Sequence, residues 1–182
     1  PNFRVVYLDN DSEDGTAELA ATQYPQVQLI RLDRNVGFGR GHNRVTDLAL
    51  RQGADFVTIL NVDTTVEPAW LTELVAAGLA DRGVAVWMPL QYDYSGEQLD
   101  ENFLRTARRN PRFAADQAAG KLARTYDVPT AIGAAALFPR SSLSGLGGFD
   151  PHYFAYCEES DWCHRAFVAG LRVGLATRAG IR

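Results

Sequence analysis

The sequence predicts an α/β protein in which helices flank a mostly parallel sheet. Strand-like and helix-like segments alternate along most of its 182 residues, with short connections between them. The apolar run at residues 56–60 shows no polar alternation, which is typical of a parallel strand buried on both faces. Polar side chains directly follow this run and the apolar run at residues 4–8. Ligands bind at that carboxyl edge in open α/β sheets.

The composition is that of a globular domain, and we expect residues 1–182 to form a single one. Hydrophobic residues make up 46% of the chain and charged residues 22%, which is sufficient for one real core. The net charge of -4 argues against a nucleic-acid partner. Cys157 and Cys163 lack metal or redox spacing, so we interpret them as reduced. We expect no signal peptide and no transmembrane segment, since no run approaches about 18 apolar residues.

The first third of the chain predicts a parallel βαβ unit. Residues 4–8 and residues 27–32 are strand-like, and a helix with small residues on one face lies between them. Four acidic residues occur within residues 9–14. A helix cap does not use all of them, so Asp9, at the strand end, is a candidate ligand contact.

Glycines at alternate positions mark the next loop, at residues 35–43. Gly37, Gly39 and Gly41 precede a predicted helix and indicate close approach to a ligand or to a neighbouring loop. The stretch fits neither a dinucleotide fingerprint, because position 42 is His, nor a phosphate-binding P-loop. Tight packing of the loop alone is an equally good interpretation.

The strand at residues 56–60 ends in Asn61-Val62-Asp63. An amide and a carboxylate at this position can hold a divalent cation and the phosphates it carries. A polar turn that satisfies nearby backbone groups is the alternative. Pro68 then predicts the first turn of an apolar helix.

A strand is predicted at residues 84–88. The segment 91–127 that follows has no clear period, and we expect it to be a variable insertion on the side of the molecule where an acceptor substrate would bind. Its arginines, Arg105, Arg108, Arg109 and Arg112, suit either an anionic acceptor or a solvated helix face. On the second interpretation the acidic residues at positions 97–101 balance their charge.

The last third predicts two strands, at residues 131–138 and 171–175, and two helices, at residues 141–145 and 158–170. The first strand is rich in small residues, which indicates that something packs closely against it. A turn at residues 147–150 separates the first helix from an aromatic segment.

Three acidic residues crowd the start of the last helix. Its dipole stabilises negative charge there, and Asp161 and Arg165 have the spacing of a helical ion pair. Glu159 lies on the same helix side as Trp162, toward the protein body, where a carboxylate is costly unless it is used. Such a carboxylate can act as a general base, and Glu158 lies beside it.

Five stretches together resemble the inverting family 2 glycosyltransferases with the GT-A nucleotide-sugar fold, a Rossmann-like sheet, and especially their bacterial rhamnosyltransferase-like branch. They lie in the family's order at residues 6–16, 35–43, 60–63, 147–150 and 154–161. Each stretch alone is a weak signal, but five in order span nearly the whole chain.

The resemblance implies a role for each matching residue. Asp9 would recognise the nucleotide base, Asn61 and Asp63 would bind a divalent cation (Mn or Mg) and the diphosphate, and Glu159 would be the base, with Asp161 and Glu158 as rivals. The implied donor-binding residues are Asp9, Asn10, Asn35, Gly37, Gly39, Gly41, Asn43, Asn61 and Asp63, and the implied acceptor-side residues are Gly148, Phe149, Asp150 and Trp162.

The implied function is transfer of a sugar from a nucleoside-diphosphate sugar to a saccharide or lipid-linked acceptor with inversion, such as rhamnosyl transfer in bacterial surface polysaccharide synthesis. A cytoplasmic location, at the inner face of the membrane, follows from that function. The alternative is an inactive nucleotide-sugar-binding or structural fragment. A nucleotidyltransferase is disfavoured because its glycine-rich phosphate loop with an early basic residue is missing.

The sequence departs from the family in four places. Asn61 and Glu159 each stand where Asp is commoner, and no His follows His164 to match the family's later metal ligand. The usual first strand is lacking, so the chain reads as a segment of something longer. We expect the resulting gap between the strands at 4–8 and 56–60 to be filled by another chain, through strand exchange or a homo-oligomer, by a shifted strand, or by close approach of the two neighbours.

Overall fold

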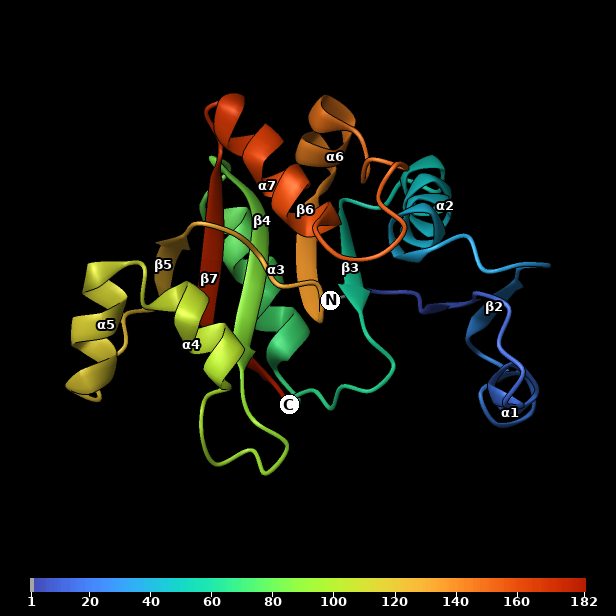
Figure 1. Cartoon of the computed structure of the whole chain (residues 1–182), viewed down its shortest axis with the longest axis horizontal. Coiled ribbons are helices and arrows are strands. Elements are labelled where there is room, and N and C mark those ends of the chain that lie inside the picture. Colours follow the sequence, from blue (N-terminus) through green and yellow to red (C-terminus); the bar gives the residue numbers. More distant parts are fainter. Residues whose placement is uncertain (1) are drawn as a thin grey trace.

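A computed structural model describes residues 2–182 and confirms the α/β class (Figure 1). The strands are β1 (Val6–Asp9), β2 (Gln28–Arg31), β3 (Phe56–Leu60), β4 (Val84–Gln91), β5 (Thr125–Val128), β6 (Ala135–Pro139) and β7 (Arg172–Ile181). The helices are α1 (Thr16–Gln23), α2 (Phe38–Arg51), α3 (Trp70–Ala80), α4 (Glu101–Ala107), α5 (Pro111–Ala118), α6 (Arg140–Leu146) and α7 (Glu158–Val168).

The larger sheet has five strands in the order β3-β6-β4-β7-β5. Strands β4 and β7 are parallel, while β6 is antiparallel to both of its neighbours and β5 is antiparallel to β7. The sheet is therefore mixed, and β3, β4 and β7 end at the same edge. That common edge places the residues that follow β3 beside the residues that precede β6.

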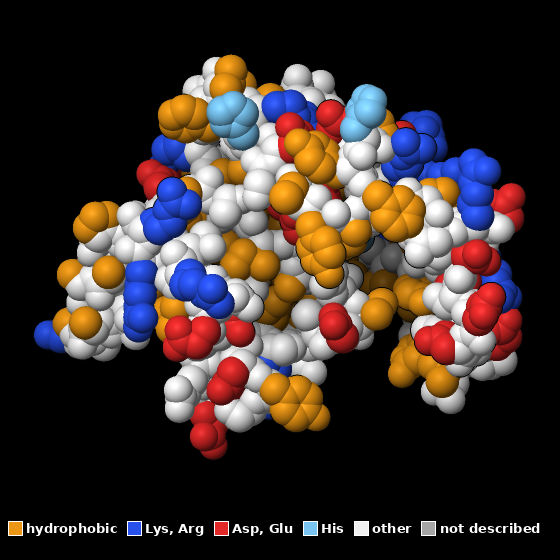
Figure 2. All heavy atoms as spheres, in the orientation of Figure 1, with side chains coloured by type: hydrophobic (Ala, Val, Ile, Leu, Met, Phe, Trp, Pro, Cys, Tyr) orange, Lys and Arg blue, Asp and Glu red, His pale blue; other side chains and the backbone are white. Residues whose placement is uncertain are grey.

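The smaller sheet contains β1 and β2 alone, paired in parallel. Within residues 2–182 no strand pairs with the second edge of β1 or with the outer edge of β3. The expectation that a shifted strand or a close approach of these two strands closes the gap is therefore wrong. Instead α2 contacts both strands and holds the two sheets together, and Figure 2 shows a notch bordered by hydrophobic side chains between the two parts. Filling by another chain stays a prediction.

Helices cover both faces of the larger sheet. On one face α3 packs Leu74 against Trp87 and Leu137, and on the other the core contains Trp162 of α7 together with Phe103 of α4. Figure 1 shows α3 behind the sheet and α4 and α7 in front of it.

The segment 91–127 is more ordered than an insertion without a period. It contains α4, α5 and most of β5, and the side chains of Phe103 and Phe113 are fully buried. Hydrophobic periodicity does not reveal α4 and α5, but the capping residues at their starts do. Asp100 caps α4 and accepts a hydrogen bond from the Phe103 N–H (2.9 Å), and Asn110 caps α5 ahead of Pro111. The segment is thus part of the core.

The arginines of this segment are exposed, as the solvated-face interpretation predicts. Their partners are not the acidic residues 97–101. Arg105 and Arg108 donate to the amide oxygens of Asn102 and Gln117, and Arg112 pairs with Asp116 at 3.6 Å.

Several predicted boundaries are wrong, most clearly at the glycine stretch. Helix α2 begins at Phe38, so Gly39 and Gly41 lie in its first turns rather than in a loop. A Cβ at Gly39 would lie 3.1 Å from the Phe149 Cβ, and one at Gly41 would lie 2.8 Å from a Leu8 methyl carbon. The glycines therefore serve close packing of the helix against two neighbours.

Other elements shift by a few residues. Helix α3 begins at Trp70 instead of Pro68, because the N–H of Glu67 bonds to the Gly180 carbonyl (3.1 Å) and ties that residue to the end of β7. Strand β6 begins at Ala135, leaving residues 131–134 as a turn, and β7 continues to Ile181.

Candidate active site

The carboxyl end of β3 forms a turn that leaves Asp63 exposed. The Asn61 N–H donates to the Ala134 carbonyl (2.9 Å), and the Thr64 hydroxyl donates to the Asn61 carbonyl (2.6 Å). The backbone thus makes the polar turn of the second interpretation. The Asp63 side chain stays exposed to solvent, and cation binding by this stretch stays a prediction. Among residues 2–182, no three His, Cys, Asp or Glu side chains are grouped to hold a metal ion.

Asp9, at the end of β1, is fully buried. Its Oδ1 accepts a hydrogen bond from the Ser12 N–H (3.0 Å). Its Oδ2 lies 3.3 Å from Arg31 Nε, yet has no partner of hydrogen-bond geometry among the described residues. A buried carboxylate oxygen without a hydrogen bond is costly, so a ligand N–H that reached it would be stabilised.

Asn10 and Asn35 join the loop after β1 to the loop before α2. The Asn10 amide donates to the Asn35 side-chain oxygen (3.0 Å) and accepts from the Val36 N–H (2.9 Å), and the Asn35 oxygen also accepts from the Gly37 N–H (2.9 Å). In this structure the two amides therefore fix the shape of the loops.

The Gly37 loop supports the segment that precedes α7. Gly37 has a φ of 86°, and a Cβ there would overlap the Phe154 carbonyl oxygen. The neighbouring Phe38 N–H donates to that same oxygen at 2.9 Å. Glycine is required here by both the left-handed backbone and the close contact.

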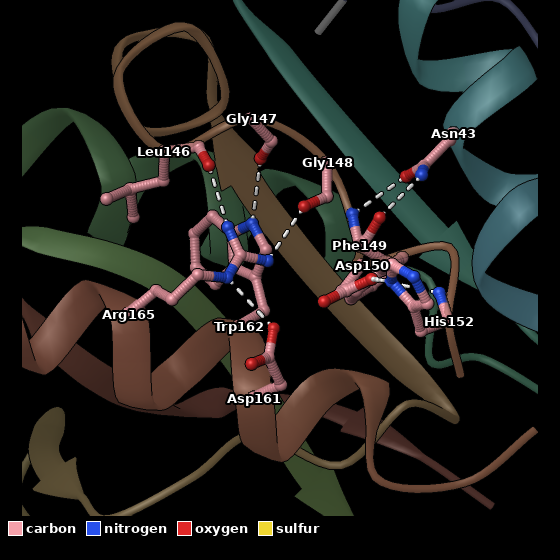
Figure 3. Close-up of polar contacts among 10 residues, drawn as sticks. All are labelled: Asn43, Leu146, Gly147, Gly148, Phe149, Asp150, His152, Asp161, Trp162 and Arg165. Carbon is pink, nitrogen blue, oxygen red and sulfur yellow. Dashed lines mark hydrogen bonds and ion pairs between the residues drawn. The ribbon is translucent and has the colours of Figure 1, made fainter.

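Asn43 holds the backbone of the turn at residues 147–150 (Figure 3). Its Nδ2 donates to the Phe149 carbonyl (2.7 Å), and its Oδ1 accepts from the Phe149 N–H (2.8 Å). A Cβ at Gly148 would lie 2.8 Å from the Asn43 Cγ, so glycine is what lets the amide approach. Both polar groups of Asn43 are occupied by this contact.

Arg165 and Trp162 fix the same turn from α7 (Figure 3). Arg165 pairs with Asp161 at 2.9 Å and also donates to the carbonyls of Leu146 and Gly148, while the indole N–H of Trp162 donates to the Gly147 carbonyl (2.9 Å). The predicted ion pair thus exists in this structure and occupies Asp161.

The four predicted acceptor-side residues have different surroundings. Trp162 and Phe149 are only 1% and 7% exposed and belong to the core. The Gly148 carbonyl is bonded to Arg165, and Asp150 contacts the His152 ring at 2.8 Å. Of the four, only Asp150 has an accessible functional group.

Glu158 and Glu159 remain as the acids at the start of α7 that are not committed to an ion pair. Glu158 is buried, with one carboxylate oxygen unpartnered among the described residues. Glu159 is half-buried beside an apolar space lined by Ile59, Ile132 and Phe149. Burial raises the pKa of Glu159 and the charge of Glu158 raises it further, while the backbone of Glu159 itself and, to a smaller extent, that of Gly133 oppose the rise. A carboxylate with a raised pKa is a stronger base.

The backbone that presents these acids is unusual. Tyr156 and Cys157 both have positive φ values, 67° and 72°, immediately before Glu158. Non-glycine residues rarely adopt this conformation, and when they do they cluster at functional sites.

The family model of glycosyl transferase family 2 matches residues 1–147. The chain belongs to this family. The match contains Asp9, the glycine stretch and Asp63, and the acids of α7 lie beyond it.

A curated relative extends the likeness to most of the chain. The N-acetylglucosaminyl-diphospho-decaprenol L-rhamnosyltransferase of Mycobacterium tuberculosis, found in two strains, is 28% identical over 188 residues, which cover 91% of this chain. The chain spans 61% of that glycosyltransferase's length. The resemblance to a rhamnosyltransferase-like family 2 protein is confirmed.

Solved glycosyltransferases share the fold. GalNAc-T7, crystallised with UDP, GalNAc and Mn2+, aligns with a TM-score of 0.68 and 15% identity over 98% of this chain and 37% of its own. The mannosyltransferase PcManGT from Pyrobaculum calidifontis, in complex with GDP-Man and Mn2+, aligns with a TM-score of 0.62 and 23% identity over 96% of this chain and 45% of its own. The GT-A fold is thereby confirmed. Among residues 2–182, no helix has both the length and the apolar character needed to cross a membrane.

Sequence reasoning passed over Gly133 and His42 as contributors to this region. Gly133 contacts Glu159 from a position 26 residues earlier in the chain, and only the small-residue run around it gave a signal. His42 appeared only as the residue that breaks a glycine motif, yet its ring packs between Phe38 (4.2 Å between ring centroids) and Phe149 (6.4 Å).

We expect His42 to make the fold sensitive to acid. Burial lowers its pKa from 6.5 to about 4, so the folded state stays unprotonated at pH values where the unfolded chain binds a proton. Stability is then full above about pH 6.5 and falls by on the order of 2 to 3 kcal/mol as the pH drops to 4. Urea unfolding at pH 7 and pH 4.5 measures the loss.

The variant His42→Phe should show a smaller loss over the same pH range, because the aromatic packing stays and the titrating group is gone. His164→Gln, at an exposed position of α7, is the matched control and should behave like the wild type. Equal pH dependence in the wild type and His42→Phe would refute the assignment.

Proposed function

We propose that this chain is a single catalytic domain, or a large part of one, that transfers a sugar from a nucleoside-diphosphate sugar to a saccharide or lipid-linked acceptor with inversion. The observation that carries the proposal is Glu159. It is a half-buried carboxylate with a raised pKa, at the amino end of α7 in a glycosyltransferase fold. Burial makes such a group costly for the fold and useful to a reaction.

In the proposed reaction Glu159 accepts the proton of an acceptor hydroxyl. The hydroxyl oxygen attacks the anomeric carbon of the donor, and the bond from that carbon to the diphosphate oxygen breaks as the new glycosidic bond forms. A single displacement inverts the configuration. The nearby negative charge of Glu158 raises the pKa of Glu159 and therefore favours uptake of the proton.

The proposed donor-binding site lies at the carboxyl edge of the sheets. Asp9 has a buried carboxylate oxygen without a hydrogen bond, which suits an N–H of the nucleotide base. The Asn10 and Asn35 amides hold the loops around it, and the helix start at Gly39 allows Phe149 to pack closely. In this proposal Asp9 recognises the nucleotide base, and the other residues support the loops that surround it.

Asp63 and Asn61 offer oxygen ligands of the kind that Mg²⁺ and Mn²⁺ prefer. A divalent cation, when bound, would neutralise the departing diphosphate. Two structural relatives were solved with Mn2+. Since Asn61 contributes an amide instead of a second carboxylate, we expect weak cation binding without a nucleotide.

The similar M. tuberculosis protein is named as a rhamnosyltransferase acting on a diphospho-decaprenol acceptor. On that basis we propose rhamnosyl transfer to a lipid-linked saccharide at the inner face of the membrane as the most specific form of the function. Transfer of [14C]rhamnose from dTDP-rhamnose to a lipid-linked GlcNAc, measured for the complete protein, tests it. Equal transfer from other sugar nucleotides would contradict the sugar assignment.

Titration calorimetry with UDP and dTDP, with and without Mn²⁺, tests donor binding directly. We expect cation-dependent binding of one of them and a loss of at least tenfold in affinity for Asp63→Ala, because the only carboxylate of the proposed pair is removed. Asp55→Ala is the matched control, since Asp55 is exposed at the opposite end of β3, and it should bind like the wild type. No cation-dependent heat from either nucleotide would favour the alternative of an inactive structural fragment.

A further inference from the structure

Gly133 lies in the buried turn before β6 and touches the Glu159 carboxylate. A Cβ built on Gly133 would overlap Oε1 of Glu159 and would lie 2.9 Å from its Cδ and 3.2 Å from its Cγ. Real Cβ atoms do not approach this closely, so any other residue at position 133 would displace the carboxylate.

The backbone conformation does not explain this glycine. Its φ lies outside the left-handed region, in contrast to Gly37 or Gly147. The reason for glycine at position 133 is the space that Glu159 occupies. Gly145 provides a comparison, since a Cβ there would meet nothing within 4 Å and its φ is likewise unexceptional.

The contact is also polar. The nearby Gly133 backbone favours the charged form of the Glu159 carboxylate, whereas burial, the largest influence on its pKa, favours the neutral form. Ile132, the neighbour of Gly133, and Phe149 add apolar surface beside the carboxylate. The turn thus sets both the place and the proton affinity of one functional group.

We infer that Gly133 is a positioning residue for Glu159: the missing side chain leaves the space in the turn that the carboxylate occupies. The inference rests on the proposed function, in which Glu159 is the base. A base that is displaced by about 1 Å from the acceptor hydroxyl loses much of its effect, since proton transfer requires hydrogen-bond distance.

The test compares Gly133→Ala with Gly145→Ala. In Gly133→Ala we expect the Glu159 pKa to fall toward its ordinary value, because the carboxylate is pushed out of the buried turn and burial is the main cause of its rise. NMR titration of protein labelled with 13C-glutamate, with Glu159→Gln to assign the signal, measures this pKa without any assay of activity. Gly145→Ala should leave it unchanged.

Kinetics of the complete protein provide the second readout. For Gly133→Ala we expect kcat to fall at least tenfold and the acid limb of its pH profile to move to lower pH, with the donor KM within twofold of the wild type. The double variant Gly133→Ala/Glu159→Asp should be more active than Gly133→Ala alone, because the shorter side chain makes room for the new methyl group.

An unchanged Glu159 pKa in Gly133→Ala, or kinetics equal to those of Gly145→Ala, would overturn the inference. The inference would also be overturned if kcat fell equally in Gly133→Ala and Gly145→Ala, in proportion to their loss of thermal stability. A purely structural role of the glycines predicts that result. If the wild type transfers no sugar, the proposed function fails, while the NMR comparison still decides whether Gly133 positions the carboxylate.

Discussion

Replacing Glu159 by Gln should reduce sugar transfer by a factor of about 10² to 10⁴ while the donor still binds. Glutamine keeps nearly the same shape but cannot accept a proton from the acceptor hydroxyl, and general base catalysis contributes a factor of this size. Glu159 belongs to α7 and not to the Asp9 and Asp63 loops that are proposed to bind the donor, and the substitution keeps the size of the side chain, so nucleotide affinity should not change. Initial rates and calorimetry on the same preparation measure both quantities.

Asp161→Asn and Glu158→Gln are the matched comparisons. Asp161 is bonded to Arg165, so we expect its loss to cost stability and to leave turnover within about tenfold. Glu158→Gln removes a charge that raises the pKa of Glu159 and should move the acid limb of the pH profile to lower pH. If Glu159→Gln retained turnover and either Asp161→Asn or Glu158→Gln lost it, the residue replaced in the inactive variant would be the base.

Hydrophobic pattern predicts most of this fold because most of it is regular. The runs that became β3 and β4 are apolar without alternation, and β4 is buried throughout, as this pattern predicts. The expectation of a parallel strand buried on both faces is wrong for β3, which lies at the sheet edge, pairs only with the antiparallel β6 and is buried only at Val57 and Ile59. Pattern fails at α4 and α5, two helices of 7 and 8 residues that are defined by their caps. It also fails at α2, where Gly39 and Gly41 lower helix propensity and tertiary packing against Phe149 and Leu8 overrides it.

Local sequence pattern likewise predicts part of the candidate site and misses the rest. A strand end followed by a carboxylate predicts the places of Asp9 and Asp63 with no tertiary information. The partners that occupy Asn43 lie 106 residues away in the chain, and no local pattern discloses such a contact. The same holds for Gly133, whose significance comes from a carboxylate on another element.

The two sheets differ in how well they are supported. Strand β1 pairs on one side only, with a partner of four residues, and two-stranded sheets are marginal without further packing. The proposed donor-binding residues Asp9 and Asn10 lie at this weakly supported edge, whereas Glu159, the proposed base, lies on a helix packed against the five-stranded sheet. We therefore expect the geometry of the base to tolerate solvent and temperature changes better than the geometry of the donor loops.

Removal of the Trp162 side chain should cost about 3 to 5 kcal/mol of the free energy of unfolding. The indole is 1% exposed, packs edge-to-face on Phe138 at 4.9 Å between ring centroids, and donates to the Gly147 carbonyl. Trp162→Ala would leave a large cavity and a carbonyl without a partner. Urea unfolding followed by circular dichroism measures the difference.

Two further variants separate packing from a direct role toward an acceptor. Phe167→Ala removes another aromatic side chain of α7, one that is 75% exposed, and should change stability by less than about 0.5 kcal/mol. Trp162→Phe keeps most of the apolar surface and loses the hydrogen bond, so we expect about 1 to 3 kcal/mol. If Trp162→Ala unfolded at the urea concentration of the wild type but raised the acceptor KM, Trp162 would contact the acceptor. If Trp162→Ala loses more stability than Trp162→Phe, Trp162 belongs to the core that holds the turn and α7 in place.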